Sequence, residues 1–298
     1  MKSFVRSIAI RCYVIIRSGL YRLRQVAGRP VAFRVASSMR IVLDPVGQIA
    51  ELLYTSRFER RDLELVGRLL RPGMKVVDIG ANIGLYSILA GKRVAPDGQV
   101  WAFEPSAETT QRLHRNLQLN EVTTVKTVRT ALSDLSEKNG GRLELARDRG
   151  RGDGERFLLA GGARDLYNRE RPAVEDVESV PVTTLDDYFF AGEIDPPRID
   201  FLKIDIEGGE MLVFNGARRL LTANREIVIM FESTPESSRR YGYRQEDLFA
   251  LLRDLGFHLF YWDREVRDWR SEPDRLLSAG NLWATRDQAL LPRWPVGS

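Results

Sequence analysis

Short apolar runs alternate with segments of helical hydrophobic spacing along most of the chain. The runs at 75–79, 99–103, 125–130, 199–204, 226–231, 257–262 and 282–285 have the length of buried strands. Between several of them, apolar residues recur three and four positions apart, as in Leu248, Leu251, Leu252 and Leu255. Alternation of this kind predicts an α/β domain with a doubly wound, mostly parallel, seven-stranded sheet that helices cover on both faces.

The first 70 residues precede this rhythm. Residues 3–24 predict an amphipathic helix, with Val5, Ile8 and Cys12 on its apolar face. Such a helix packs on the protein or on a second copy in a homo-oligomer, lies on an anionic membrane surface, or is a transit peptide. Residues 31–43 predict a small hairpin that turns at 37–38, followed by a helical stretch that ends at Leu70. We therefore divide the chain into a helix at 1–29, a lead-in at 30–70 and a domain at 71–290.

The strand–helix rhythm breaks at residues 133–180. Residues 147–154 are rich in arginine and glycine and poor in apolar residues, so they predict a loop. The apolar runs at 143–146 and 157–160 flank this loop and predict a hairpin. An insertion at this point lies near the carboxyl ends of the strands, where ligands bind in such sheets. Both a lid over the site and a plain surface loop fit the pattern.

The charge is unevenly distributed. The whole chain of 298 residues has a net charge of +4, yet residues 1–43 hold nine Lys/Arg and no acid, so the remainder carries +4 − 9 = −5. A basic nucleic-acid-binding face on the main domain is therefore not expected. Cys12 is the only cysteine, which excludes an internal disulfide and fits a cytoplasmic location, with the membrane's inner face as an option. We expect no secretory signal, and no stretch approaches the ~18 apolar residues that span a bilayer.

The most informative stretch begins at the end of the first predicted strand. Asp78 ends the strand, and Gly80, Asn82 and Gly84 follow in the turn to a helix. Gly80 lets the backbone approach a ligand, and Gly84 permits close packing where the helix begins. Asn82 stands where a dinucleotide-binding turn has glycine, and the Asp78 carboxylate would repel a pyrophosphate. A cationic sulfonium ligand with an amino-acid moiety suits this turn better.

Two further strands end in charged residues. Glu104 follows the second strand, 20 residues after Gly84, where an acid accepts hydrogen bonds from two ribose hydroxyls. Lys203, Asp205 and Glu207 alternate with apolar residues where the fourth strand runs into a glycine turn. Charges at a buried strand end are costly unless they are paired, so these residues indicate either a functional role or a structural ion-pair network.

Residues 78–84, 103–105, 184–187 and 202–210 resemble, in order and spacing, the FkbM family of methyltransferases. The resemblance covers roughly residues 40–285 and implies the Rossmann-like class I methyltransferase fold, S-adenosylmethionine as donor, and O-methylation of a sugar, glycan or secondary-metabolite hydroxyl. Gly209 departs from the family, which more often has alanine there. By this resemblance Asp78, Gly80 and Asn82 line the methionine end, Glu104 the ribose, and Ala131 and Leu132 the adenine. The other expected cofactor-binding residues are Ala81, Gly84, Tyr86, Pro105, Ser106 and Asp205.

A hydroxyl acceptor benefits from a general base or a cation beside its oxygen. The two histidines, His114 and His258, are not in positions that suggest catalysis. By elimination the candidate bases are Asp205, Glu207 and Glu232, and Lys203 completes the catalytic set. Asp205 and Glu232 are alternatively ligands of a divalent cation such as Mg²⁺.

Two other functions compete with methyl transfer. A nicotinamide-dependent oxidoreductase shares the acid at the end of the second strand, but the chain lacks the glycine pattern that this cofactor requires. A non-catalytic scaffold at a membrane is the other alternative. The acceptor itself is not predicted, because fold does not dictate substrate.

Overall fold

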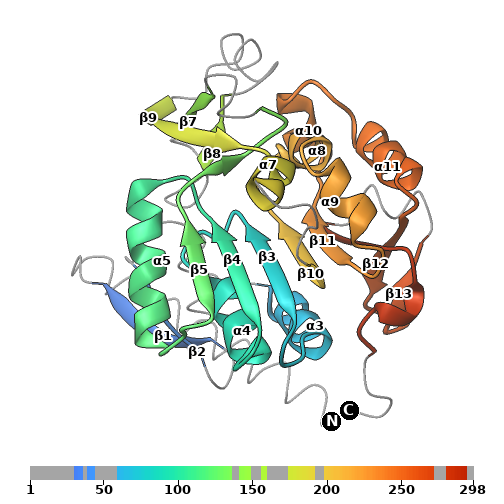
Figure 1. Cartoon of the computed structure of the whole chain (residues 1–298), viewed down its shortest axis with the longest axis horizontal. Coiled ribbons are helices and arrows are strands. Elements are labelled where there is room, and N and C mark those ends of the chain that lie inside the picture. Colours follow the sequence, from blue (N-terminus) through green and yellow to red (C-terminus); the bar gives the residue numbers. More distant parts are fainter. Residues whose placement is uncertain are drawn as a thin grey trace, which may run out of the picture.

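The computed structural model describes residues 30–35, 39–43, 59–135, 141–148, 156–159, 174–191, 198–271 and 280–293. Their centre is an eight-stranded sheet of order β13-β12-β14-β11-β10-β3-β4-β5 (Figure 1). Its strands are β3 (Lys75–Ile79), β4 (Gln99–Phe103), β5 (Val125–Val128), β10 (Phe201–Ile204), β11 (Val228–Glu232), β12 (His258–Asp263), β13 (Asp268–Arg270) and β14 (Asn281–Thr285).

The direction of the strands matches the expected doubly wound sheet. The five strands from β5 to β11 pair in parallel. β14 is antiparallel to both β11 and β12, so β12 runs with the parallel set. The sheet contains the seven predicted strands and one more, β13, which pairs with β12 as a hairpin. At three residues, β13 is too short to leave a periodic pattern in the sequence.

Helices cover both faces of the sheet. Neighbouring residues of a strand point to opposite faces, and in this sheet the residues on both faces are apolar. Val77 belongs to an apolar core with α7 (Leu185–Phe190), α8 (Glu210–Asn215), α9 (Arg218–Ala223) and α11 (Gln245–Asp254). Val76 belongs to a second core with α3 (Arg60–Leu69), α4 (Leu85–Val94) and α5 (Ala107–Leu119). Two cores explain why the strands are apolar at consecutive positions instead of alternating with polar residues.

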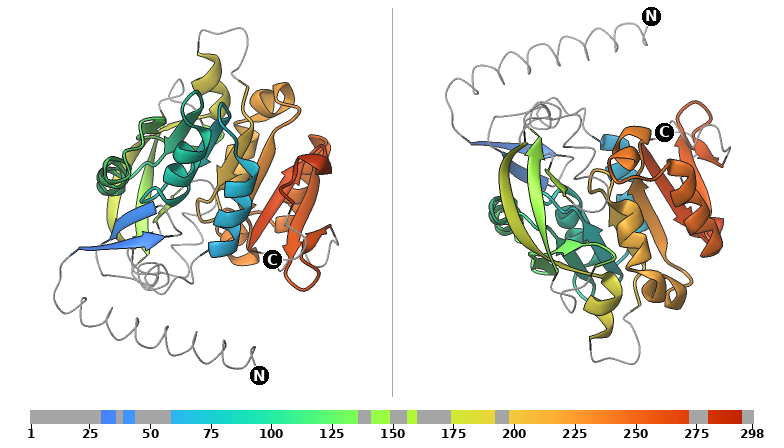
Figure 2. Two further views of the ribbon diagram at one scale, coloured as in Figure 1. Left: turned by 90° about the horizontal axis from the view of Figure 1, so that it is seen from below. Right: turned by 90° about the horizontal axis from the view of Figure 1, so that it is seen from above.

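The predicted N-terminal hairpin is present as β1 (Val31–Val35) and β2 (Met39–Leu43). Two side-chain amides of α5 hold it, because Asn120 Oδ1 accepts the Arg40 N–H at 2.9 Å and Asn116 Oδ1 accepts the Val42 N–H at 2.8 Å. Figure 2 shows this hairpin beside α5. The predicted turn at 37–38, the helix at 3–24 and residues 44–58 of the lead-in lie outside the described residues. None of the helices that the structure describes is long and apolar enough to span a membrane.

The insertion forms a second sheet of order β6-β9-β7-β8. The predicted hairpin is confirmed, since β7 (Arg142–Asp148) pairs with β8 (Arg156–Leu158) and Leu145 lies opposite Leu158. β9 (Val174–Thr183) joins it to β6 (Ala131–Leu132), the continuation of the chain after β5. In Figure 1 this sheet lies over the carboxyl ends of β3, β4 and β5. Most of the predicted 147–154 loop lies outside the described residues.

After β10 the apolar residues Val213, Leu220 and Leu221, which are spaced as on one helix, lie on two short helices, α8 and α9, separated at Gly216. A Cβ on Gly216 would lie 2.2 Å from the Ser133 carbonyl oxygen, so two backbone segments meet here. The Gly216 carbonyl oxygen also accepts the Asp186 N–H at 2.9 Å. Contact with distant segments therefore interrupts the helix, which hydrophobic spacing alone does not reveal. The remaining helices are α10 (Pro235–Arg240) and the 3₁₀ helix η2 (Gln288–Leu290).

Candidate active site

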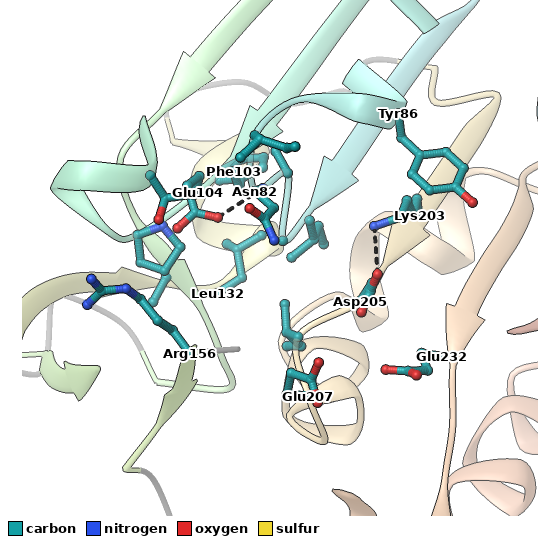
Figure 3. A pocket seen from close by; sticks show the side chains of 18 of the residues that line it. Asn82, Tyr86, Phe103, Glu104, Leu132, Arg156, Lys203, Asp205, Glu207 and Glu232 are labelled. Atoms are coloured by element: carbon teal, nitrogen blue, oxygen red, sulfur yellow. Dashed lines mark hydrogen bonds and ion pairs between the residues drawn. The ribbon is translucent and has the colours of Figure 1, made fainter. Parts of the chain in front are cut away.

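A cavity of about 310 Å³ lies where β3, β4, β10 and β11 end, below the insertion sheet (Figure 3). This volume is at the lower end of the range of about 300–1,000 Å³ for small-molecule sites. Figure 3 shows two polar ends: Glu104, Asn82 and Arg156 at one, and Lys203, Asp205, Glu207, Glu232 and Tyr86 at the other. The carboxyl ends of parallel strands are the ligand-binding edge of such sheets.

The turn after β3 forms one wall of the cavity. Gly80, Asn82 and Gly84 have left-handed backbones, with φ of 73°, 49° and 95°. The N–H groups of Gly80 and Ala81 both donate to the Phe103 carbonyl oxygen at 3.0 Å, which fixes the turn against the end of β4. A Cβ on Gly80 would lie 1.9 Å from the Asp205 carbonyl oxygen. Gly80 is therefore required by contact between two loops, a reason that the sequence did not reveal.

Glu104 links this turn to the start of α5. Its Oε2 accepts the Asn82 N–H and its Oε1 accepts the Ser106 N–H, each at 3.0 Å. Each carboxylate oxygen retains acceptor capacity, because an ionised carboxylate offers about four lone-pair sites. Burial raises the pKa of Glu104 to about 7, although the two backbone N–H groups and Arg156 act to lower it. Glu104 is a nearly buried acceptor that lines the cavity.

Lys203 is the centre of the other polar end. Its Nζ lies 3.3 Å from Asp205 Oδ2, 3.7 Å from Asp78 Oδ1 and 4.8 Å from the Tyr86 ring centroid. Burial lowers the pKa of Lys203, but Asp205 and Asp78 raise it more, so the net shift is upward and the ammonium stays charged. Asp205 projects into the cavity, whereas Asp78 is 1% exposed and does not line it.

Asp78 therefore differs from the expectation that it lines the methionine end. Its Oδ2 accepts the Ser87 Oγ–H at 2.6 Å, and its Oδ1 faces Lys203. Burial raises the pKa of Asp78, while Lys203 and Ser87 lower it. The carboxylate lies beneath the turn, because a residue on the last buried part of β3 points into the sheet interior. Asp78 contacts Lys203 and Ser87 and is not among the residues that line the cavity.

Three carboxyl groups converge next to Lys203. One oxygen from each of Asp205, Glu207 and Glu232 lies within 4.8 Å of the others. Burial, followed by the charges of Asp205 and Glu207, raises the pKa of Glu232 to about 10. The raised pKa favours the protonated form of Glu232 beside these two acids.

Glu210, the first residue of α8, holds the loop that carries two of these acids. Its Oε1 accepts the N–H groups of Ile206 and Gly208, each at 3.2 Å. The loop is strained, since Glu207 and Gly208 have φ of 60° and 113°. Burial raises the pKa of Glu210 to about 7, although the backbone donors lower it. Glu210 is thus a positioning residue for Asp205 and Glu207.

Most of the predicted site residues do line the cavity. They are Gly80, Ala81, Asn82, Tyr86, Glu104, Pro105, Ala131, Leu132, Lys203, Asp205, Glu207 and Glu232. Gly84 and Ser106 do not. A Cβ on Gly84 would lie 2.5 Å from Leu113 Cδ1, which agrees with its expected packing role. The Ser106 side chain is buried and caps α5 by accepting the Thr109 N–H at 3.3 Å.

Two charged residues of the cavity, Glu59 and Arg156, were not among the predicted site residues. Glu59 precedes α3, in a segment without a recognisable motif, and burial followed by Asp205 raises its pKa to about 7. Arg156 belongs to β8 of the insertion, and its Nη2 donates to Glu108 Oε2 at 3.0 Å. Both residues reach the site through tertiary packing. The Arg/Gly-rich composition beside Arg156 was the one available signal, and it indicated a loop.

The chain is similar to known methyltransferases. The sequence model of the methyltransferase FkbM domain matches residues 78–259. The chain is 31% identical to methyltransferase sdnD of Sordaria araneosa over 68% of its own length and 80% of that protein. It is 30% identical to the AMB antimetabolite synthetase AmbE of Pseudomonas aeruginosa over 70% of its length, which spans 11% of AmbE. Among solved structures, methyltransferase FkbM of Methylobacillus flagellatus aligns with 79% of this chain and 54% of its own, at 16% identity and a TM-score of 0.40.

These similarities decide between the alternatives that the sequence left open. The family match runs from the end of β3 to β12 and includes both polar ends of the cavity except Glu59. It excludes the nicotinamide-dependent oxidoreductase, and the sheet, with β14 reversed between β11 and β12, agrees with the class I fold. The chain belongs to the FkbM family of S-adenosylmethionine-dependent methyltransferases.

Proposed function

We propose that the chain transfers a methyl group from S-adenosylmethionine to a hydroxyl group of a sugar, glycan or secondary metabolite. The observation that carries this proposal is the convergence of Asp205, Glu207 and Glu232 at one end of the cavity. A hydroxyl oxygen becomes a better nucleophile when a carboxylate accepts its proton. The name of AmbE, an antimetabolite synthetase, favours a secondary metabolite as acceptor.

The described residues fit the cofactor. Glu104 has both oxygens ordered by backbone N–H groups and retains acceptor capacity towards two ribose hydroxyls. Ala131 and Leu132 offer an apolar surface to an adenine ring. When bound, S-adenosylmethionine supplies an electrophilic methyl group on a sulfonium. We assign the methionine moiety to the end of the cavity beside Lys203 and Asp205.

The protein contributes positioning and proton transfer. Methyl transfer is an in-line displacement, so alignment of acceptor and donor supplies much of the acceleration. Lys203 stays cationic between Asp78 and Asp205 and fixes the direction of the Asp205 carboxylate. Burial and the charges of Asp205 and Glu207 favour the protonated form of Glu232, so the carboxylate of Asp205 or Glu207 would accept the acceptor's proton.

A divalent cation is the second candidate occupant of this cluster. Carboxylate oxygens are preferred ligands of Mg²⁺, and the oxygens of Asp205, Glu207 and Glu232 are close enough to share one ion. The cation would then replace the proton on Glu232 and polarise the acceptor oxygen. A chelator distinguishes the two roles. If the carboxylates act as a general base, methyl transfer continues in EDTA. If a cation is required, methyl transfer stops in EDTA and is restored by Mg²⁺.

The reaction is tested with donor that is labelled in its methyl group. Purified protein is incubated with sugars, lipid-linked sugars and hydroxylated metabolites, and in parallel with amine and carboxylic acid analogues. Labelled products that resist mild alkali and in which the amino groups are unmodified are methyl ethers, as proposed. Label that enters only amines, or only esters that alkali cleaves, would overturn the hydroxyl assignment while leaving methyl transfer intact.

Location remains a proposal from the sequence. The excess of basic residues in 1–43 suits an anionic membrane surface, and homo-oligomer formation is the competing role of residues 3–24. Deletion of residues 1–28 should reduce sedimentation of the protein with anionic vesicles. Unchanged sedimentation together with a smaller oligomer in solution would assign this segment to subunit contact instead.

A further inference from the structure

Glu59 and Tyr86 form a polar pair in the cavity. Tyr86 belongs to the region that the family model matches, and Glu59 lies outside it. Tyr86 lies in the first turn of α4, while Glu59 immediately precedes α3, well before the matched residues 78–259. Both line the cavity. Figure 3 shows Tyr86 above Lys203, at the end of the cavity opposite Glu104. The pair therefore belongs to the end that we assigned to the methionine moiety.

The Tyr86 hydroxyl lies beside the Glu59 carboxylate, to which it can donate its proton. Tyr86 is 6% exposed, and within the part of the chain that the structure describes its hydroxyl oxygen accepts no hydrogen bond. The position of this hydroxyl is fixed, because the Tyr86 ring packs against the Lys203 ammonium. Leaving a buried polar atom unpaired costs free energy, so an acceptor in such a position normally receives a ligand or water.

Charge points to the kind of ligand group. Lys203, whose charge also acts on the Glu59 carboxylate, already pairs with Asp205 and Asp78. This end of the cavity therefore has more carboxyl groups than cations. Buried carboxylates are stable only when they are paired, so the site is complementary to a cation. A neutral hydroxyl acceptor would leave this excess uncompensated.

The cofactor carries a suitable group at the right end. If the ribose binds Glu104, the methionine moiety extends towards Lys203 and Asp205, as the proposed function requires. Its α-ammonium offers three N–H donors, which need oxygen acceptors. The Glu59 carboxylate and the Tyr86 hydroxyl provide two acceptors on one side of this end, while the Lys203 ammonium carries the charge that suits the α-carboxylate.

We propose that Glu59 and Tyr86 form the subsite for the α-ammonium group of the cofactor's methionine moiety. This inference rests on the proposed placement of S-adenosylmethionine. It extends the cofactor site to a residue outside the matched family region. It also explains why a glutamate in a left-handed conformation, with φ of 39°, is held at the mouth of α3 beside the first turn of α4.

The test compares two ligands on two variants by titration calorimetry. S-adenosylhomocysteine and its analogue without the α-amino group are titrated into the full-length protein, into Glu59→Gln and into Tyr86→Phe. Glu59→Gln should weaken S-adenosylhomocysteine about 10- to 100-fold, as expected for a lost charge-assisted hydrogen bond, and Tyr86→Phe by several-fold. The analogue should bind wild type and Glu59→Gln equally.

A matched control lies on the same helix. Glu64 is a partly exposed glutamate of α3 that pairs with Arg68 and does not line the cavity, and Glu64→Gln should leave both affinities unchanged. Equal weakening of both ligands, or no weakening, in a Glu59→Gln variant with a wild-type melting temperature would overturn the subsite. Failure of the wild type to bind S-adenosylhomocysteine would instead overturn the cofactor placement on which the subsite rests.

Discussion

Gly80 and Asp205 meet backbone to backbone: a Cβ on Gly80 would lie 1.9 Å from the carbonyl oxygen of Asp205. The two residues end neighbouring parallel strands, since the Asp205 N–H donates to the Ile79 carbonyl oxygen at 3.1 Å. This contact joins the turn that forms one cavity wall to the loop that carries Asp205 and Glu207. A change at Gly80 must therefore move both halves of the site together.

We expect Gly80→Ala to destabilise the protein and to weaken S-adenosylhomocysteine. The substitution adds a clash of about 1–3 kcal/mol to the left-handed backbone cost of about 1–2 kcal/mol. Gly73→Ala is the matched control, because Gly73 has φ of 83° but no atom within 4 Å of its Cβ position. In urea unfolding, the free energy of unfolding of the control should fall only by the cost of the left-handed backbone. Equal losses in the two variants would show that the contact with Asp205 is easily relieved.

Asp78 and Lys203 should be energetically coupled. Removing one member of a buried ion pair costs about 3–5 kcal/mol, and Asp78→Asn should fall near the lower limit because Lys203 keeps Asp205. Both Asp78→Asn and Lys203→Met should also weaken S-adenosylhomocysteine, since Asp205 loses its orientation. In a double-mutant cycle by urea unfolding, the combined variant should be more stable than the sum of single losses predicts, by about 0.5–3 kcal/mol. Additive losses would contradict the positioning role of Asp78.

Cofactor affinity should depend on pH through Glu104. Because burial raises the pKa of Glu104 to about 7, the ionised acceptor of ribose hydroxyls is lost as the pH falls. The affinity for S-adenosylhomocysteine should therefore decrease from about pH 8 to about pH 5.5, approaching tenfold per pH unit below the pKa. Glu104→Gln should bind weakly without this dependence on Glu104. A wild-type pH profile that persists in Glu104→Gln would assign the titration to Glu59 or Glu210.

The effect of Glu104 on folding stability has the opposite sign. Its pKa is higher in the folded state than the ordinary value of 4.5, so the native protein binds more protons between these two values. This contribution to stability is fully present below about pH 4.5 and is lost as the pH rises through about 7. Ligand-free Glu104→Gln should therefore lose less stability than wild type between those pH values, as measured by urea unfolding.

The sheet and one wall of the site were predictable because they depend on local patterns. Apolar runs that end in Asp78, Glu104 or Asp205 place acids at the carboxyl edge of a parallel sheet, whatever the details of packing. The direction of each side chain was not predictable in this way. Asp78 is buried and Asp205 lines the cavity, although both follow an apolar run, because Asp78 lies within β3 opposite Lys203, whereas Asp205 is the first residue after β10.

The residues that were missed reach the cavity through long-range contacts. Glu59 precedes a helix that packs on α4, and the insertion brings Arg156 over the ends of strands that lie far away in the sequence. Neither position is marked by periodicity or by a turn motif. The division of the helix after β10 has the same origin, since the backbone contact of Gly216 with Ser133 depends on tertiary structure.

We predict that the insertion contributes to cofactor binding through Arg156. Its side chain is 11% exposed, it joins β8 to Glu108 of α5, and its charge acts to lower the pKa of Glu104. Arg156→Ala should weaken S-adenosylhomocysteine several-fold, because the insertion loses an ion pair that holds it over the cavity. It should also shift the midpoint of the pH profile to higher pH, since Glu104 then ionises less readily.

Arg142→Ala is the control, because the exposed Arg142 of β7 donates to Ser179 at 2.9 Å on the same sheet, away from the cavity lining. Equal behaviour of the two variants would reduce the insertion to a surface element without influence on the site.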